Sequence, residues 1–286
     1  MSSPVQLDHV VVAVRDLREA SRVYEALGFN VVAGGCHGHA PTRNALIAFT
    51  DGSFIELIEW TAHSPDDRWQ RVLEQDGEGL VDFALSVADL PELLGRARRL
   101  GIEMDGPMDG SRVTPSGHRL RWQVGRPASS ELPFLCADIT PRTLRVPDGD
   151  ARMHPNGVVG MDMVLVAVPD AHASLDTYRC LFEVDVDRDQ APGAQYATDK
   201  LGVTACVAKL KGCGVALVSP VPSAATPAAT YVGRIVERRG AGAYAISLCL
   251  PEGREARSAS PAETCGLYLR FSPIAESLDR KIYPAD

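Results

Sequence analysis

The sequence lacks any apolar run of the roughly 18 consecutive residues that a membrane-spanning helix needs. Its amino terminus also lacks the basic stretch and apolar core of a secretory signal. We therefore expect a cytoplasmic protein that has no membrane partner.

Paired cysteine motifs are missing as well. The seven cysteines are an odd number and contain no C-x-x-C pair, so the sequence predicts neither a disulfide framework nor a zinc ribbon. Most of them lie in apolar runs and are expected to be buried thiols. Cys36 stands beside two glycines and is the candidate for an accessible thiol.

Excess positive charge is also absent. The formal net charge is −8, and the only basic cluster, Arg96 to Arg99, falls on the polar side of an expected helix. Because nucleic-acid binding draws on clustered Lys and Arg, no nucleic-acid partner is expected. The 45% hydrophobic and 23% charged residues are typical of a soluble globular protein.

What the sequence does contain is an internal repeat. Residues 7–16 recur without a gap as residues 161–170, at an offset of 154 residues, and the register continues from Tyr24 to Tyr178. Such a repeat indicates a duplicated supersecondary unit. His9 stands opposite Met163 in this comparison, so any chemistry at this position belongs to the first copy alone.

The pattern of the first copy predicts a β-α-β-β-β unit. Residues 7–14 alternate as a half-covered strand does, and Asp16 with Glu19 forms a capping-box signature for a helix that ends at Gly28. Three short apolar runs follow, at 31–33, 44–49 and 53–60, and Asp51-Gly52 between the last two predicts a hairpin.

Two further copies are indicated between and after these. Asp82 stands where His9 stands, seven residues before the capping Asp89, and the copy continues through strands at 119–124 and 132–139. A fourth, shortened copy fits residues 245–250 and 266–271. Residues 140–157 lack an apolar period and are interpreted as a linker, which predicts two domains, at 1–145 and 155–286.

Several motifs carry a resemblance to a known family. They are Leu7-Asp-His-Val-Val-Val-Ala-Val14, Gly34-Gly-Cys-His37, Thr42-Arg-Asn44, Phe54-Ile-Glu-Leu-Ile58, Leu132-Pro-Phe134 and His154-Pro-Asn-Gly157. In this order they resemble the glyoxalase-like domain family of the vicinal oxygen chelate superfamily. The resemblance implies an α+β fold in which four tandem β-α-β-β-β modules pair into two glyoxalase/dihydroxybiphenyl-dioxygenase-like domains.

The resemblance also implies where a divalent metal would sit. In this superfamily the first and last strands of two paired modules hold it, and these positions map onto His9, Glu56, Asp82 and Phe134 in the first half. The second half has Met163, Ala216, Ala245 and Tyr268 instead, none of which suits a divalent cation. A site in the first half would use His9, Glu56 and Asp82, a set that suits Mn, Fe, Co, Ni or Zn.

Glu56 points to chemistry on physical grounds, because it interrupts an apolar strand on the same face as Phe54 and Ile58. A carboxylate there costs several kcal/mol unless a metal or a hydrogen-bonding partner offsets the burial. Three alternatives remain open: His9 and Glu56 bind a metal, they act directly as a catalytic acid and base, or they form a structural pair.

Other polar and aromatic residues are candidates for substrate contacts. His37 and His39 lie in a glycine-rich loop expected at the cavity rim, and Asn44 heads a strand. On the strand at 119–124, either Arg121 offers a cation to the cavity or Trp122 forms an apolar wall. The predicted substrate-binding residues are therefore His37, Asn44, Arg121, Trp122 and Phe134, whereas His118, His154 and His172 are interpreted as exposed or structural.

Two functions from different classes are compatible with these residues. One is an isomerase or lyase that forms an enolate from a small oxygenated molecule. The other is a non-catalytic protein that sequesters a small molecule, as resistance proteins of the superfamily do. An extradiol dioxygenase is disfavoured, because the second half lacks the ligands of that class. We expect no nucleotide cofactor, a small-molecule partner, and a monomer or homodimer.

Overall fold

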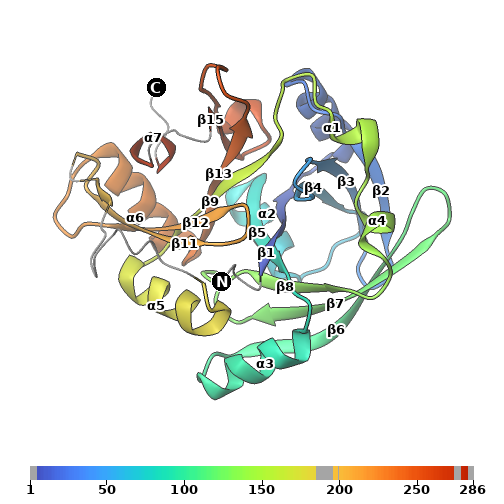
Figure 1. Ribbon diagram of the computed structural model, residues 1–286, viewed down its shortest axis with the longest axis horizontal. Helices are drawn as coiled ribbons and strands as arrows, with labels where there is room; N and C mark the ends of the chain where they lie inside the picture. The colour runs from blue at the N-terminus through green and yellow to red at the C-terminus, as the bar shows by residue number, and fades with distance from the viewer. Residues whose placement is uncertain (1–4, 185–195, 199, 274–277, 283–286) are drawn as a thin grey trace.

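The computed structural model describes residues 5–184, 196–198, 200–273 and 278–282 (Figure 1). The two halves of the chain lie side by side in Figure 1, the first in blue to green and the second in yellow to red. The first half contains β1 (Gln6–Ala13), α1 (Leu17–Ala26), β2 (Val32–His37), β3 (Thr42–Ala48), β4 (Phe54–Trp60), α2 (Arg68–Asp76), β5 (Gly79–Ser86), α3 (Leu90–Arg99), β6 (Met104–Val113), β7 (Arg119–Pro127), β8 (Phe134–Asp138) and α4 (Arg142–Arg145).

A 3-10 helix, Gly149–Arg152, leads to the second half. This half contains β9 (Gly160–Ala167), α5 (Ala171–Phe182), β10 (Tyr196–Thr198), β11 (Val203–Lys209), β12 (Gly214–Pro220), α6 (Pro227–Arg239), β13 (Gly242–Leu250), β14 (Arg257–Ala259), the 3-10 helix Pro261–Glu263, β15 (Tyr268–Pro273) and α7 (Asp279–Ile282).

Each half builds one curved sheet. In the first half the strands close into a barrel in the order β1-β4-β3-β2-β6-β7-β8-β5, and in the second they form a seven-stranded sheet in the order β10-β11-β12-β9-β13-β15-β14. β1 runs parallel to β4 as β9 does to β12, and His9 and Met163 occupy equivalent strand positions. The predicted α+β fold of paired modules is confirmed.

Local signals in the first copy act as expected. Asp16 caps α1 by accepting the backbone N–H groups of Arg18 and Glu19, although the Glu19 side chain pairs with Arg22 and does not complete a capping box. The β3–β4 hairpin turns at Gly52, whose φ of +85° favours glycine. Helices α2 and α6 are additions to the predicted unit, and both follow the last strand of a module.

The largest apolar core is shared by the two halves. Val10, Val12 and Val14 of the first half belong to the same buried cluster as Val164 and Val166 of the second. Two tyrosines that are equivalent in the repeat also tie the halves together: Tyr24 donates to the Thr264 carbonyl at 3.0 Å, and Tyr178 donates to the Glu131 carbonyl at 2.8 Å.

The concave sides of the two sheets differ. In the second half, Ala228, Ala229 and Val232 of α6 are buried in one cluster with Leu165, Ala216 and Ala245, so apolar side chains fill this side. In the first half, the concave side keeps polar residues around a cavity. No helix in the described ranges is both long enough and apolar enough to cross a membrane.

The first residues of the segment predicted as a linker pack against the first half. Arg142 and Arg145 of α4 form ion pairs with Asp8 of β1, and Val146 is buried. These contacts are long-range, so the local pattern of residues 140–157 gave no signal for them.

Candidate active site

His9 and Glu56 meet on the floor of the first-half cavity. Residues of β1 and β4 are in parallel register, with His9 beside Phe54 and Val11 beside Glu56. Because side chains alternate along a strand, His9 and Glu56 share the inner face. His9 Nε2 lies 3.3 Å from Glu56 Oε2, and the two residues are only 5% and 7% exposed. The predicted convergence of this pair is confirmed.

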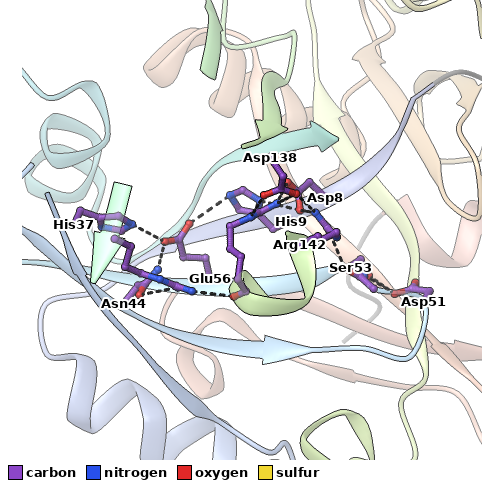
Figure 2. Close-up of polar contacts among 12 residues, drawn as sticks. Asp8, His9, His37, Asn44, Asp51, Ser53, Glu56, Asp138 and Arg142 are labelled. Atoms are coloured by element: carbon purple, nitrogen blue, oxygen red, sulfur yellow. Dashed lines mark hydrogen bonds and ion pairs between the residues drawn. The ribbon is translucent and has the colours of Figure 1, made fainter. Parts of the chain in front are cut away.

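Two further residues contact the other oxygen of the Glu56 carboxylate. The Asn44 side-chain amide of β3 donates to Oε1 at 2.5 Å, and His37 Nε2 lies 3.6 Å from the same atom. His37 Nδ1 is 2.8 Å from the Thr42 hydroxyl, which orients the ring. Figure 2 shows the carboxylate between the two imidazoles, with His37 on one side and His9 on the other.

Gly34 makes room for this arrangement. A Cβ atom at this position would lie 2.1 Å from Asn44 Oδ1 and 2.6 Å from Arg112 Nη1. No real Cβ approaches so closely, so any other residue would displace both side chains. The Gly34-Gly35 pair lies on β2 at a register shift against β3, where an irregular backbone brings the strand close to Asn44.

A buried ion-pair network lies behind His9. Asp8 is fully buried; its Oδ2 accepts from Arg145 Nη2 at 2.8 Å, and its Oδ1 lies 2.6 Å from Arg142 Nη1. Arg145 also binds Asp138, with distances of 2.6 Å and 3.0 Å. Sequence reasoning missed this network. A signal was available, however, since the repeat aligns Asp8 with Asp162, whose side chain pairs with Lys281 at 2.6 Å.

Arg112 connects the network to Glu56. Its Nη1 donates to Asn44 Oδ1 at 3.2 Å, and its Nη2 donates to the Arg145 carbonyl at 2.9 Å. Sequence reasoning missed Arg112 too, because the polar and glycine-rich sequence of β6 did not predict a strand. The guanidinium holds the Asn44 amide in the orientation that donates to Glu56.

The protonation states follow from these contacts. Burial alone would raise the pKa of Glu56, but His9, His37 and Asn44 outweigh it and lower this pKa from 4.5 to about 2. Burial alone would lower the pKa of His9, yet the carboxylates of Asp8 and Glu56 raise it above 6.5. For His37 burial dominates and lowers the pKa to about 4. At neutral pH, Glu56 is therefore ionised and His37 is neutral, while the raised pKa of His9 shifts this residue toward the imidazolium.

The cavity has a volume of about 290 Å³ and includes most of the predicted site. His9, Glu56, His37, Asn44, Trp122 and Phe134 all line it, as does His39. Phe54 stacks on the His9 ring at 4.5 Å, and Phe134 meets the same ring edge-on at 5.3 Å. The site thus combines polar groups at its floor with aromatic walls, which is typical of small-molecule cavities.

Asp82 departs from its predicted position as a third ligand. Its strand register is as predicted, since Phe83 packs into the shared core on the outer side. The Asp82 carboxylate, however, forms an ion pair with Arg68 and accepts from Trp69 Nε1 at 2.9 Å, so it does not line the cavity. Both partners belong to α2, the helix that the sequence pattern did not reveal.

Arg121 is also misplaced by the sequence prediction. It is exposed and lies outside the cavity, because Trp122 and Val124 of β7 take the inner face. The cavity arginines are Arg112, Arg126 and Arg145 instead. Three histidines behave as interpreted: His118 is exposed, His154 bridges the Asn30 amide and the Ala48 carbonyl, and His172 contacts Cys206.

Comparison with known proteins identifies the family. The model of a glyoxalase-like domain matches residues 7–182, which is more than half of the chain. The chain belongs to the glyoxalase-like domain family. No curated protein matches the sequence significantly.

Solved structures share this fold. A hypothetical protein from Staphylococcus aureus is 13% identical with a TM-score of 0.67, over 94% of this chain and 99% of that one. A mutant of 4-hydroxymandelate synthase from Streptomyces coelicolor is 15% identical with a TM-score of 0.59, over 87% of this chain and 72% of that one. Identities this low show the fold alone.

Proteins of the vicinal oxygen chelate superfamily typically hold a divalent metal, but the side chains of this glyoxalase-like domain do not fit one as they are arranged. Asp82 is bound by α2, and Phe134 offers no donor atom. His9 and His37 flank Glu56 on opposite sides and do not surround a common point (Figure 2). Across the described ranges, no three His, Cys, Asp or Glu side chains gather as metal ligands.

Proposed function

We propose that this protein is an enzyme that moves a proton next to a carbonyl group of a small oxygenated molecule. The observation that carries the proposal is the buried Glu56 carboxylate on the cavity floor, held between two imidazoles and an amide. A pure binding site could be built from apolar walls alone. A carboxylate and an imidazolium 3.3 Å apart in such a cavity supply a base and an acid together.

Glu56 is the base and His9 the acid in this mechanism. The His9 imidazolium donates to the carbonyl oxygen of the substrate, while Glu56 accepts the proton from the adjacent carbon. A pKa of about 2 makes Glu56 a weak base in the free enzyme. As negative charge develops on the substrate oxygen, the imidazolium turns to that oxygen and depresses the Glu56 pKa less, so proton transfer and enolate formation assist one another.

The neighbouring residues prepare this step. Asn44 fixes one oxygen of Glu56, and Arg112 fixes Asn44 in turn. His37 is neutral and held by Thr42, so it can accept or donate one hydrogen bond to the substrate. Phe54 and Phe134 cover the His9 ring and keep water from it.

The fate of the enolate decides the reaction class. If Glu56 or His37 returns the proton to a different carbon or to the opposite face, the enzyme is an isomerase. If the enolate expels a group from the next carbon, with His9 or His37 protonating the leaving group, it is a lyase. Both outcomes use the same first step, so the first step is the one to test.

Proton exchange in D₂O tests the proposal without knowledge of the product. A panel of small ketones, aldehydes and oxo acids is incubated with the protein, and loss of the proton next to the carbonyl is followed by NMR. Glu56→Gln should slow this exchange at least about 100-fold, the lower end of general acid–base effects. Glu59→Gln is the matched control, because Glu59 lies on the same strand but pairs with Arg43 away from the cavity.

Two outcomes would contradict the proposal. Exchange retained in a well-folded Glu56→Gln variant would remove Glu56 from the chemistry. Tight binding of apolar ligands without exchange of any panel member by the wild-type protein would support sequestration instead. Because the described residues do not fit a metal, dialysis against a chelator should leave the exchange rate unchanged.

A further inference from the structure

Arg126 stands out among the cations of the cavity. It lies on β7, lines the cavity, and holds its guanidinium 5.2 Å from the ring centre of Trp69. Its Nε atom is buried and has no hydrogen-bond partner among the described residues. The side chain is half-buried, and this burial lowers the pKa of Arg126.

Of the acidic residues near Arg126, Asp82 and Asp67 are already engaged, and Asp105, which stands opposite Arg126 on β6, forms no ion pair with it. Asp82 is bound by Arg68 and Trp69. Asp67 caps α2 and accepts the backbone N–H groups of Trp69 and Gln70 at 2.8 Å and 3.3 Å. Within the described part of the chain, no carboxylate forms an ion pair with Arg126.

The other two cavity arginines are committed to the protein. Arg112 donates to Asn44 and to the Arg145 carbonyl, and Arg145 donates to Asp8 and Asp138. A half-buried guanidinium with unused donors is a ready partner for a carboxylate, which it can bind through two parallel hydrogen bonds.

An aromatic wall leads from Arg126 to the catalytic pair. The Trp69 ring lies 5.5 Å from Phe134, and Phe134 lies 5.3 Å from the His9 ring. All of these side chains line the same cavity, whose volume of about 290 Å³ is at the small end for ligand sites. A flat apolar body can therefore lie along this wall with one end at Arg126 and the other near Glu56.

We propose that the substrate is a small aromatic carboxylate whose anionic group binds Arg126 and whose ring packs on Trp69 and Phe134. This proposal rests on the proposed function, because it places the reacting carbonyl of such a molecule at His9 and Glu56. In this proposal Arg126 is the cation that binds an anionic substrate, a role that the sequence analysis gave to Arg121.

Binding of a matched pair of probes tests this. Phenylacetate and phenylacetamide have nearly the same shape, and only the first carries a charge. Titration is followed by calorimetry and by tryptophan fluorescence, since two of the three tryptophans, Trp69 and Trp122, line the cavity. The wild-type protein should prefer phenylacetate, and Arg126→Gln should weaken phenylacetate binding 10- to 100-fold while leaving phenylacetamide unchanged.

Two variants control the experiment. Arg121→Gln removes a positive charge from the same strand outside the cavity and should not change either affinity. Arg126→Lys keeps the charge without the paired donors and should restore part of the loss. This second variant also keeps the test valid if Arg126→Gln folds poorly.

Several results would overturn the proposal. They are equal affinity of the wild-type protein for the two probes, no binding of phenylacetate at millimolar concentration, or an equal loss in Arg121→Gln. The proposed function fails separately. If Arg126 discriminates the probes but Glu56→Gln leaves proton exchange intact, the anion site stands without the chemistry. If exchange depends on Glu56 and Arg126 is irrelevant to binding, the chemistry stands without the anion site.

Discussion

Replacing Asp8 with asparagine should destabilise the protein and change the titration of His9. Asp8 is fully buried, and its two oxygens face Arg145 at 2.8 Å and Arg142 at 2.6 Å. Asparagine keeps the shape of the side chain but removes the negative charge. It also turns an amide, which donates hydrogen bonds, toward two guanidinium groups.

The expected loss in the free energy of unfolding depends on which partners Arg142 and Arg145 keep when the Asp8 charge is removed. Removing one partner of a buried ion pair typically costs about 3–5 kcal/mol. Arg145 is almost buried but keeps Asp138, and Arg142 is 25% exposed in its side chain and keeps the Gly52 carbonyl. We therefore expect a loss near the lower end, about 3 kcal/mol.

The assay is urea unfolding at pH 7, combined with NMR titration of the His9 imidazole. Asp162→Asn is the matched control, because Asp162 is the repeat equivalent of Asp8 and pairs with Lys281 in the second half. Both variants should lose stability. Only Asp8→Asn should lower the pKa of His9, since Asp8 helps to raise it.

A loss of less than about 1 kcal/mol would refute the energetic reasoning, because such a value is typical of an exposed ion pair. An unchanged His9 titration in Asp8→Asn would refute the electrostatic link between the two neighbouring residues. Equal effects of both variants on His9 would show that the change arises from general loosening of the fold.

Two further predictions concern acid stability and the glycine beside Asn44. His37 and Glu56 both have lowered pKa values in the folded protein, so the unfolded chain binds more protons than the folded one as the pH falls. The free energy of unfolding should therefore decrease between pH 6.5 and 4 because of His37, and between pH 4.5 and 2 because of Glu56. Urea midpoints measured across these pH ranges should fall less steeply than in the wild-type protein: in His37→Asn between pH 6.5 and 4, and in Glu56→Gln between pH 4.5 and 2. Variants that follow the wild-type curve would contradict this. Gly34→Ala should cost about 1–3 kcal/mol as overpacking and slow proton exchange by displacing Asn44. The control Gly95→Ala, in helix α3, should stabilise by about 0.5–1 kcal/mol, and equal thermal midpoints for the two variants would show that Gly34 is not needed for space.

The parts of the fold that the sequence predicts are those that local chemistry decides. The Asp16 cap, the Asp51-Gly52 hairpin and the strand of His9 depend on residues a few positions apart. The pairing of His9 with Glu56 was expected because the family resemblance maps both residues onto one site, and because a buried carboxylate such as Glu56 demands a partner.

The parts that escaped prediction depend on distant partners or on weak patterns. Helix α2 begins after a polar loop and is itself largely polar, so no apolar periodicity predicted it. Arg68 and Trp69 on this helix nevertheless bind the Asp82 carboxylate and hold it away from the cavity. The contact between Asp8 and Arg145 spans 137 positions in sequence. Arg126 was overlooked because its unpaired state is visible only once its neighbours are placed.

Tyr24 and Tyr178 each donate a hydrogen bond across the junction, so each half of the molecule covers the apolar core that it shares with the other half. Each tyrosine hydroxyl reaches a backbone carbonyl across the junction, and the valines of β1 and β9 lie in one core between them. A first half expressed alone would expose that core to water, although every residue of the cavity belongs to it. The second half, whose own concave side is closed by α6, thus gives the floor of the cavity a dry and rigid backing without lining the cavity itself.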